Sequence, residues 1–191
     1  MVFKIYICKM RYFFFISFLF FSFYSSSQNV TLEIKKMISG ETTIFNGIAE
    51  NVLDLKNGTE GEVCVVFKTT KNYNINTGLN YSKTKIDENR NYNCFSGVLK
   101  VEGDFFSRFF KEQDFKITVF LGARPGVGRY VFNSGDDIFL SFSTEIGFKV
   151  KYKDFFITIF SVNEKGFQEP NGGVNEYSKG YLGASLGLII F

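Results

Sequence analysis

The stretch from Ile138 to Tyr152 alternates apolar and polar residues with hardly a break, and this pattern constrains the fold more than any other feature. A side-chain period of two places successive residues on opposite faces of a β-strand. Similar runs extend from Tyr73 to Tyr81 and from Phe115 to Ala123. No window shows the 3.6-residue period of an amphipathic helix, so the sequence predicts an all-β chain.

Turn-rich segments divide the chain into eight predicted strands, near residues 43–55, 60–69, 72–84, 91–110, 113–132, 137–152, 154–163 and 179–191. Short connections alternate with longer ones, which are predicted at 57–59, 86–89, 133–137 and 164–178. This alternation predicts an antiparallel, up-and-down, eight-stranded transmembrane β-barrel over residues 43–191, with both termini on the periplasmic side. Residues 28–42 are interpreted as an N-terminal lead-in or an extra strand, and a ten-stranded barrel is the alternative.

The first 27 residues have the composition of a secretory signal peptide. Three basic residues precede an apolar run over 12–24, and serines follow it. A run of this length is too short to span a membrane as a helix. Translation from Met10 would also give a complete signal peptide, so two start positions fit the sequence. We expect residues 1–27 to be removed on export.

Removal of residues 1–27 changes the net charge of the chain, which bears on the partners it can bind. The segment contains 3 of the 22 Lys and Arg residues and none of the 19 Asp and Glu residues, so the mature chain is formally neutral. A nucleic-acid partner would therefore find no basic surface. The two remaining cysteines, Cys64 and Cys94, could form one disulfide in an exported protein or pack as small apolar side chains.

The two faces of the predicted strands differ in a way that favours a membrane barrel. The polar face of 72–84 carries Asn, Gly and Ser rather than the Lys and Glu that a water-facing sheet usually shows. Its apolar face has a tyrosine at each end, as the aromatic girdles of membrane barrels do. The residues predicted to face lipid are Tyr73, Ile75, Leu79, Tyr81, Ile138, Leu140, Phe142, Ile146 and Phe148. The alternative is an exported soluble β-barrel that has these side chains inside and binds an apolar ligand.

On these features the chain resembles the small bacterial outer-membrane β-barrel proteins. The resemblance covers the signal peptide, the alternating strands of 43–191 and the terminal strand from Gly180 to Phe191. It implies localisation in the outer membrane, contact with outer-membrane lipid, and a monomer. It also implies that the assembly machinery recognises the terminal aromatic residue, with Phe191 and Ile189 facing lipid. The last strand departs from the family pattern, because both of its faces are apolar.

The chain contains no histidine, which bears on any enzymatic role. The enzymes among the small outer-membrane barrels resemble one another in using a histidine base, and a serine or water nucleophile needs such a base near neutral pH. The adjacent acids Asp136 and Asp137 are interpreted as part of a solvated turn. The segment Gly122–Arg129 lacks the ending of a phosphate-binding loop and is interpreted as a turn or bulge in a strand. We predict no enzyme activity, no metal site and no cofactor.

Several charged residues fall on the predicted inner face: Lys116, Arg124, Glu145, Lys149 and Lys151. Inside a narrow barrel such groups must pair with one another or meet water. We interpret them as a salt-bridge plug, with a small ion path as the alternative. Arg124 and Arg129 could also contact lipopolysaccharide phosphates. The sequence thus predicts a non-enzymatic barrel with a structural or surface-interaction role through its longer loops, 164–178 above all.

Overall fold

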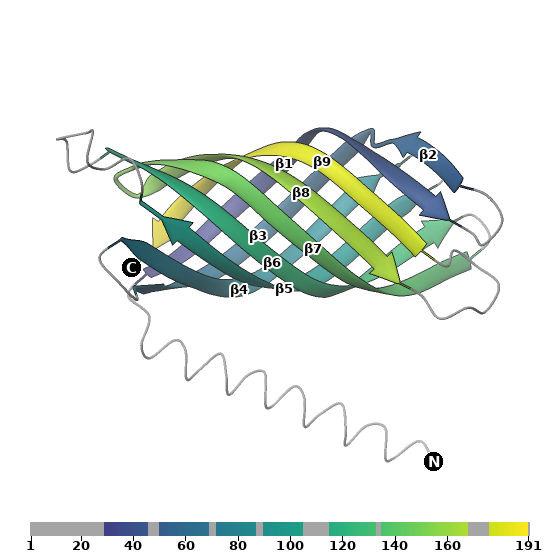
Figure 1. Cartoon of the computed structure of the whole chain (residues 1–191), viewed down its shortest axis with the longest axis horizontal. Helices are drawn as coiled ribbons and strands as arrows, with labels where there is room; N and C mark the ends of the chain where they lie inside the picture. Colours follow the sequence, from purple (N-terminus) through teal and green to yellow (C-terminus); the bar gives the residue numbers. More distant parts are fainter. Residues whose placement is uncertain are drawn as a thin grey trace, which may run out of the picture.

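The computed structural model describes residues 29–45, 50–68, 72–86, 90–104, 115–132, 135–167 and 176–190. These residues form nine β-strands and no helix (Figure 1). The strands are β1 (Asn29–Phe45), β2 (Glu50–Asp54), β3 (Asn57–Lys68), β4 (Tyr73–Lys85), β5 (Asn91–Gly103), β6 (Phe115–Phe132), β7 (Gly135–Tyr152), β8 (Phe155–Phe167) and β9 (Glu176–Ile190). The described part of the chain accordingly has no helix that is long and apolar enough to cross a membrane.

The sheet closes on itself because its first strand pairs with its last. β3 to β9 follow one another in sheet order, all antiparallel, and β1 pairs with both β3 and β9. β1 and β9 lie side by side along most of their length (Figure 1). Closure pairs backbone groups that an open sheet would leave at its edges. The predicted all-β, antiparallel, up-and-down eight-stranded barrel is therefore confirmed.

The barrel begins earlier in the chain than the sequence patterns predicted. Of the two interpretations of 28–42, the extra strand is confirmed and the lead-in is wrong, because residues from Val30 to Phe45 pair along β9 and close the barrel. The strand predicted at 43–55 is instead the end of β1 and the short β2. The predicted number of eight strands agrees with the structure all the same, because the strand predicted at 43–55 does not form a position of its own and β1 supplies one that was not counted.

β2 and β3 together occupy one position in the barrel and are separated by Leu55 and Lys56. Both strands pair with β1 in the same register, and Leu55 and Lys56 between them have no partner in the ladder with β1. β1 has an irregularity at the same level, between Met37 and Ser39. The N–H of Leu55 donates to the carbonyl of Gly40 at 2.8 Å, which holds the interruption against β1. The barrel therefore has eight positions for its nine strands.

Several predicted connections are shorter in the structure. The turn predicted at 57–59 lies inside β3, and β7 takes up most of the loop predicted at 133–137. The longest predicted loop, 164–178, is reduced to 168–175 by extension of β8 and β9. Polar residues continue the ladder at these places because the register set elsewhere in the sheet outweighs local turn propensity. The predicted signal peptide, Phe191 and the distal part of the strand predicted at 91–110 lie outside the described residues.

The cross-strand pairing shows that the strands are strongly tilted. Following the paired residues once round the barrel from Val30 leads back to β1 at Glu41, eleven residues further on and including the irregularity in β1. A stagger of this kind requires a tilt of about 35–45°. Eight strands at this tilt enclose an interior that side chains can fill.

Pro125 lies within β6, so the interpretation of this segment as a turn is wrong. The ladder between β5 and β6 is interrupted between the Ser96–Gly126 pair and the Leu99–Ala123 pair. Proline has no N–H to donate to a ladder, which accounts for the gap. The register is the same on both sides of the gap, so the segment contains no bulge.

The apolar face of each strand points outward. In β7, Leu140 is 69% exposed and Ile146 is 56% exposed. Large exposed apolar side chains on the other strands continue this band: Ile34, Val63, Leu99, Leu121, Ile157, Ile159, Leu182 and Leu186. Such a band around a closed barrel is the surface that outer-membrane barrels present to lipid.

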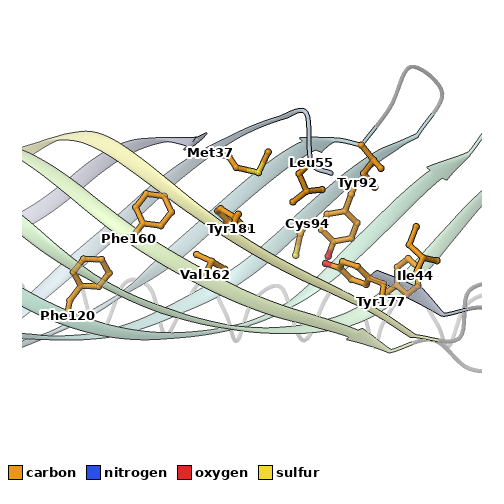
Figure 2. Close-up of a cluster of buried hydrophobic side chains, with 12 residues drawn as sticks. Met37, Ile44, Leu55, Tyr92, Cys94, Phe120, Phe160, Val162, Tyr177 and Tyr181 are labelled. Atoms are coloured by element: carbon orange, nitrogen blue, oxygen red, sulfur yellow. The ribbon is translucent and has the colours of Figure 1, made fainter. Parts of the chain in front are cut away.

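The barrel interior contains an apolar cluster that extends inward from the β2 end as far as Phe120 and Phe160 (Figure 2). The cluster consists of Met37, Ile44, Leu55, Ile86, Tyr92, Cys94, Phe120, Phe139, Phe160, Val162, Tyr177 and Tyr181. The ring centroids of Tyr92 and Tyr177 are 4.8 Å apart, and those of Phe139 and Tyr177 are 5.4 Å apart. Aromatic contacts at these distances pack the interior beneath the β2 end.

Candidate functional site inside the barrel

Charged side chains from five strands meet inside the barrel. We call them the central ion network: Glu33 and Lys35 of β1, Glu60 and Glu62 of β3, Lys100 of β5, Arg124 of β6, and Glu145 of β7. All of them are buried, and Lys35 is 0% exposed. Each lies on the inner face because side chains alternate between the two faces of a strand and these residues occupy inward positions.

Two lysines bridge carboxylates from different strands. Nζ of Lys35 lies 2.8 Å from Oε2 of Glu62 and 2.7 Å from Oε1 of Glu145. Nζ of Lys100 also pairs with Glu62, and it lies 3.3 Å from Oε2 of Glu145 and 3.6 Å from Oε2 of Glu33. Each ammonium group therefore has several carboxylate partners, which compensates the cost of burying its charge.

Arg124 connects Glu60 with Glu145 within the central ion network. Its Nη1 lies 2.8 Å from Oε2 of Glu60, and its Nη2 pairs with Glu145. Nη2 also lies 3.7 Å from Oε2 of Glu62. The planar fork of a guanidinium group lets its separate nitrogens hold two carboxylates in fixed directions, whereas each lysine holds its partners around a single nitrogen.

Neutral donors complete the network. The hydroxyl of Tyr181 and the amide of Asn80 both donate to Glu60, the latter at 3.1 Å, and the hydroxyl of Ser185 donates to Glu33. The network itself contains four carboxylates and three cations. Hydrogen bonds to the carboxylates offset the negative charge that the cations leave uncompensated.

A second ion pair lies closer to the β2 end. Nζ of Lys179 is 2.9 Å from Oε2 of Glu164. The hydroxyls of Tyr92 and Tyr177 both donate to Oε1 of Glu164 at 2.6 Å. Nζ of Lys179 also lies 4.7 Å from the ring centroid of Tyr92, within the range of a cation–π contact. This cluster links β5, β8 and β9 across the interior.

A third pair lies towards the opposite end, where Lys149 of β7 pairs with Glu102 of β5. Nζ of Lys149 lies 4.5 Å from the ring centroid of Phe156 and 5.9 Å from that of Phe120. The three clusters therefore occupy successive levels of the interior. The third pair lines a cavity at this end, and the other two clusters lie further inside with the apolar cluster.

The structure brings together three of the five inner-face residues that the sequence singled out. Arg124 and Glu145 belong to the central ion network, and Lys149 forms the third pair. Lys116 and Lys151 lie near Lys149 at the end of the barrel, outside the central ion network, where Lys116 is exposed and Lys151 is partly buried. Since Arg124 points inward and is 2% exposed, the interpretation that it contacts lipopolysaccharide phosphates is wrong. Arg129 is exposed.

Most partners of those residues were missed by sequence reasoning. Glu33 and Lys35 lie in the segment that was interpreted as a lead-in, although they alternate there with apolar residues. Glu60 and Glu62 show the same alternation around the start of a predicted strand. The period of two could have placed all four on an inner face. Nothing in the sequence indicated which charges would meet.

The residues predicted to face lipid point outward wherever the structure describes them. Tyr73, Tyr81, Ile138, Phe142 and Phe148 are each more than 40% exposed. Ile75 and Leu79 of β4 are partly exposed. The expectation for Ile189 is wrong, because Leu188 and Ile190 take the outward positions in β9 and Ile189 lines an internal cavity.

Within the described residues, no three His, Cys, Asp or Glu side chains are arranged to hold a metal ion. Cys64 and Cys94 are both buried as free thiols and are not joined by a disulfide. The thiol of Cys94 lies 3.1 Å from the hydroxyl of Ser141. Asp136 pairs with Val131 through the backbone in β7, so this acidic dipeptide continues a strand instead of forming the predicted turn.

Comparisons with known proteins agree with this architecture. No protein-family model and no curated protein sequence matches the chain. The crystal structure of neisserial surface protein A is similar with a TM-score of 0.52 at 12% identity, covering 83% of this chain and 96% of that one. At this identity the similarity concerns the fold. The chain has the fold of the small outer-membrane β-barrels.

Two further solved structures were found at lower similarity. One is Ail, the attachment invasion locus protein of Yersinia pestis, with a TM-score of 0.46 at 10% identity, covering 84% of this chain and 97% of that one. The other is the outer membrane protease OmpT from Escherichia coli, with a TM-score of 0.41 at 9% identity, covering 86% and 98%.

Proposed function

We propose that the protein is a non-enzymatic outer-membrane barrel without a through-pore, with a structural or surface-interaction role at the end where β2 lies. The observation that carries this proposal is the filled interior. The central ion network links β1, β3, β5, β6 and β7, while Asn80 and Tyr181 add β4 and β9. A water-filled pore at this level would require these ion pairs to separate and each charged group to be hydrated instead.

The outer surface supports residence in the outer membrane. Apolar side chains surround the barrel, and Tyr73 and Tyr81 flank the apolar run of β4. In water such a band would be an extended hydrophobic patch and a site of aggregation. The proposal includes contact with outer-membrane lipid, insertion by the outer-membrane assembly machinery and a monomeric state.

The charged interior also weighs against the soluble alternative. A soluble barrel that binds an apolar ligand needs an apolar cavity, with its polar strand faces in water. Here the middle of the interior contains buried Glu, Lys and Arg side chains, whereas Ile146 and Phe142 are on the outside. Recovery of the mature protein in the soluble periplasmic fraction would contradict the membrane proposal.

The non-enzymatic part of the proposal is supported by the ion pairs and hydrogen bonds of the buried glutamates. Glu62 and Glu145 are each ion-paired with three cations, and Glu164 accepts hydrogen bonds from two tyrosines and pairs with a lysine. A general base must instead be within reach of a substrate. These carboxylates lie inside the barrel, engaged by neighbouring side chains.

An interaction role is assigned to the connections at the β2 end, which is the end opposite both termini. Connections at the same end include 46–49, 87–89 and 168–175, and loops on a rigid barrel commonly carry binding functions. These segments are the candidates for contact with a partner outside the cell.

Two measurements test the proposal. The folded protein in planar bilayers should show no steady single-channel conductance, and a stable open channel would contradict the filled interior. A deletion strain should then be complemented with the native protein and with a variant in which 168–175 is replaced by a Gly-Ser linker of equal length. Full rescue of detergent resistance by the linker variant supports a structural role. Rescue by the native protein alone supports a role for this loop.

A further inference from the structure

A second internal feature lies at the end of the barrel opposite β2, where a cavity of about 280 Å³ opens. It is lined by residues near the starts of β1, β4 and β6 and near the ends of β5, β7 and β9. Its polar lining includes Glu102, Asp104, Lys116, Thr118, Lys149 and Lys151. Because an even number of strands puts both termini at one end, this is the periplasmic end of the barrel.

Two lysines of this lining face each other directly. Lys116 of β6 and Lys151 of β7 are cross-strand partners, and both side chains line the cavity. Like charges directly opposite one another destabilise a sheet. Among the described residues neither ammonium group has an ion pair, in contrast to Lys35, Lys100 and Lys149 further inside.

The next pair inward supplies a hydrogen-bonding group. Thr118 of β6 is the partner of Lys149 in β7. The hydroxyl of Thr118 is buried and has no hydrogen-bond partner within the described structure. A buried hydroxyl without a partner costs about 1–3 kcal/mol, so a ligand that accepts its hydrogen bond would be favoured.

The acidic groups of the lining reduce this positive charge without cancelling it. Glu102 is paired with Lys149, so the two neutralise one another. Asp104 lies in the wall beside Asn72, whose carbonyl accepts a hydrogen bond from the Asp104 N–H, and its carboxylate offsets one of the two remaining lysine charges. The three lysines and two acids of the lining therefore leave a net charge of +1.

We propose that this cavity binds a small anion that carries a phosphate or carboxylate group, held between Lys116 and Lys151 with the Thr118 hydroxyl as a further donor. Charge-assisted hydrogen bonds from two ammonium groups are the usual means of holding such an oxyanion. The volume suits a ligand of a few heavy atoms, near the lower limit of small-molecule sites. In the periplasm the anion could be free phosphate or the terminal carboxylate of a short peptide.

Isothermal titration of the whole folded barrel in detergent tests the proposal, with inorganic phosphate in one arm and N-acetyl-dialanine in the other. Saturable binding in one arm identifies the oxyanion, and binding in both shows that the site takes either. Absence of binding in both arms overturns the proposal. Lys116→Gln with Lys151→Gln should weaken binding by about tenfold or more, which corresponds to about 1.4 kcal/mol or more.

Matched controls separate the cavity from general attraction to a lysine-rich protein. Lys83→Gln removes a lysine that is exposed on the outside of β4, and it should leave binding unchanged. Equal losses in the Lys83 variant and in the double variant would overturn the proposal. Unboiled gel mobility establishes that each variant is folded. Thr118→Val keeps the shape of the side chain and should weaken binding severalfold without affecting the lysines.

Discussion

Replacing Arg124 by methionine removes the guanidinium group that joins the carboxylates of the central ion network. Arg124 contacts Glu60 at 2.8 Å, pairs with Glu145 and lies 3.7 Å from Glu62. Methionine retains much of the apolar stem but carries no charge. The variant leaves four buried carboxylates with two lysines, so we expect the folded state to lose stability.

The size of the loss follows from two opposing terms. At an effective dielectric constant of about 20, unit charges 2.8 Å apart attract by about 6 kcal/mol, and those 3.7 Å apart by about 4.5 kcal/mol. Removal of the arginine also removes the cost of taking it out of water, which offsets most of this attraction. The net loss for breaking a buried pair is about 3–5 kcal/mol, a large share of the roughly 5–15 kcal/mol of a typical domain.

Urea unfolding in lipid vesicles, followed by circular dichroism and by unboiled gel mobility, measures this loss. The control is Lys83→Met, which removes a cation from an exposed position on β4 and should change stability by no more than about 0.5 kcal/mol. Adding Glu145→Gln to the Arg124 variant should cost less than the sum of the two single changes, by about 0.5–3 kcal/mol. If Arg124→Met unfolds at the same urea concentration as the control, the ion network does not stabilise the barrel.

Three further predictions use the same unfolding assay or a thiol assay. At Gly187 an added Cβ would overlap the ring of Phe156, so Gly187→Ala should lower the free energy of unfolding by about 1–3 kcal/mol. Gly180 has open space around its Cβ position, so Gly180→Ala should be neutral or slightly stabilising. Equal costs for the two substitutions would refute this packing. Ile146→Arg in the middle of β7 should lower the free energy of unfolding in lipid by about 2–4 kcal/mol, and Ile138→Arg near the strand end by only about 0–1 kcal/mol. The reverse order would contradict the proposed depth of these residues in the membrane. The two buried cysteines should resist alkylation until the barrel unfolds, and gel mobility should not respond to reductant; a mobility shift would reveal a disulfide.

The positions of most strands could be predicted from the sequence, because the alternation of apolar and polar residues is a local pattern. Seven of the eight predicted segments, from 60–69 onward, overlap the strands β3 to β9. Arg124, Glu145 and Lys149 could be placed on an inner face because side-chain direction follows from position in a strand. The connections were less predictable, because turn-forming residues at 57–59 are held in β3 by pairing with β1 and β4.

The tertiary structure decided which strand closes the barrel and which charges meet. β1 has a short-range pattern like that of other strands, but only its pairing with β9 shows that it belongs to the barrel. Lys35 and Glu145 are 110 residues apart and meet because tilt, register and closure bring β1 and β7 to one level of the interior. By itself the sequence determined the two faces of each strand, since a period of two is a property of the local backbone. The partners across the interior depend on the stagger of the whole sheet, and that exists only once the last strand has paired with the first.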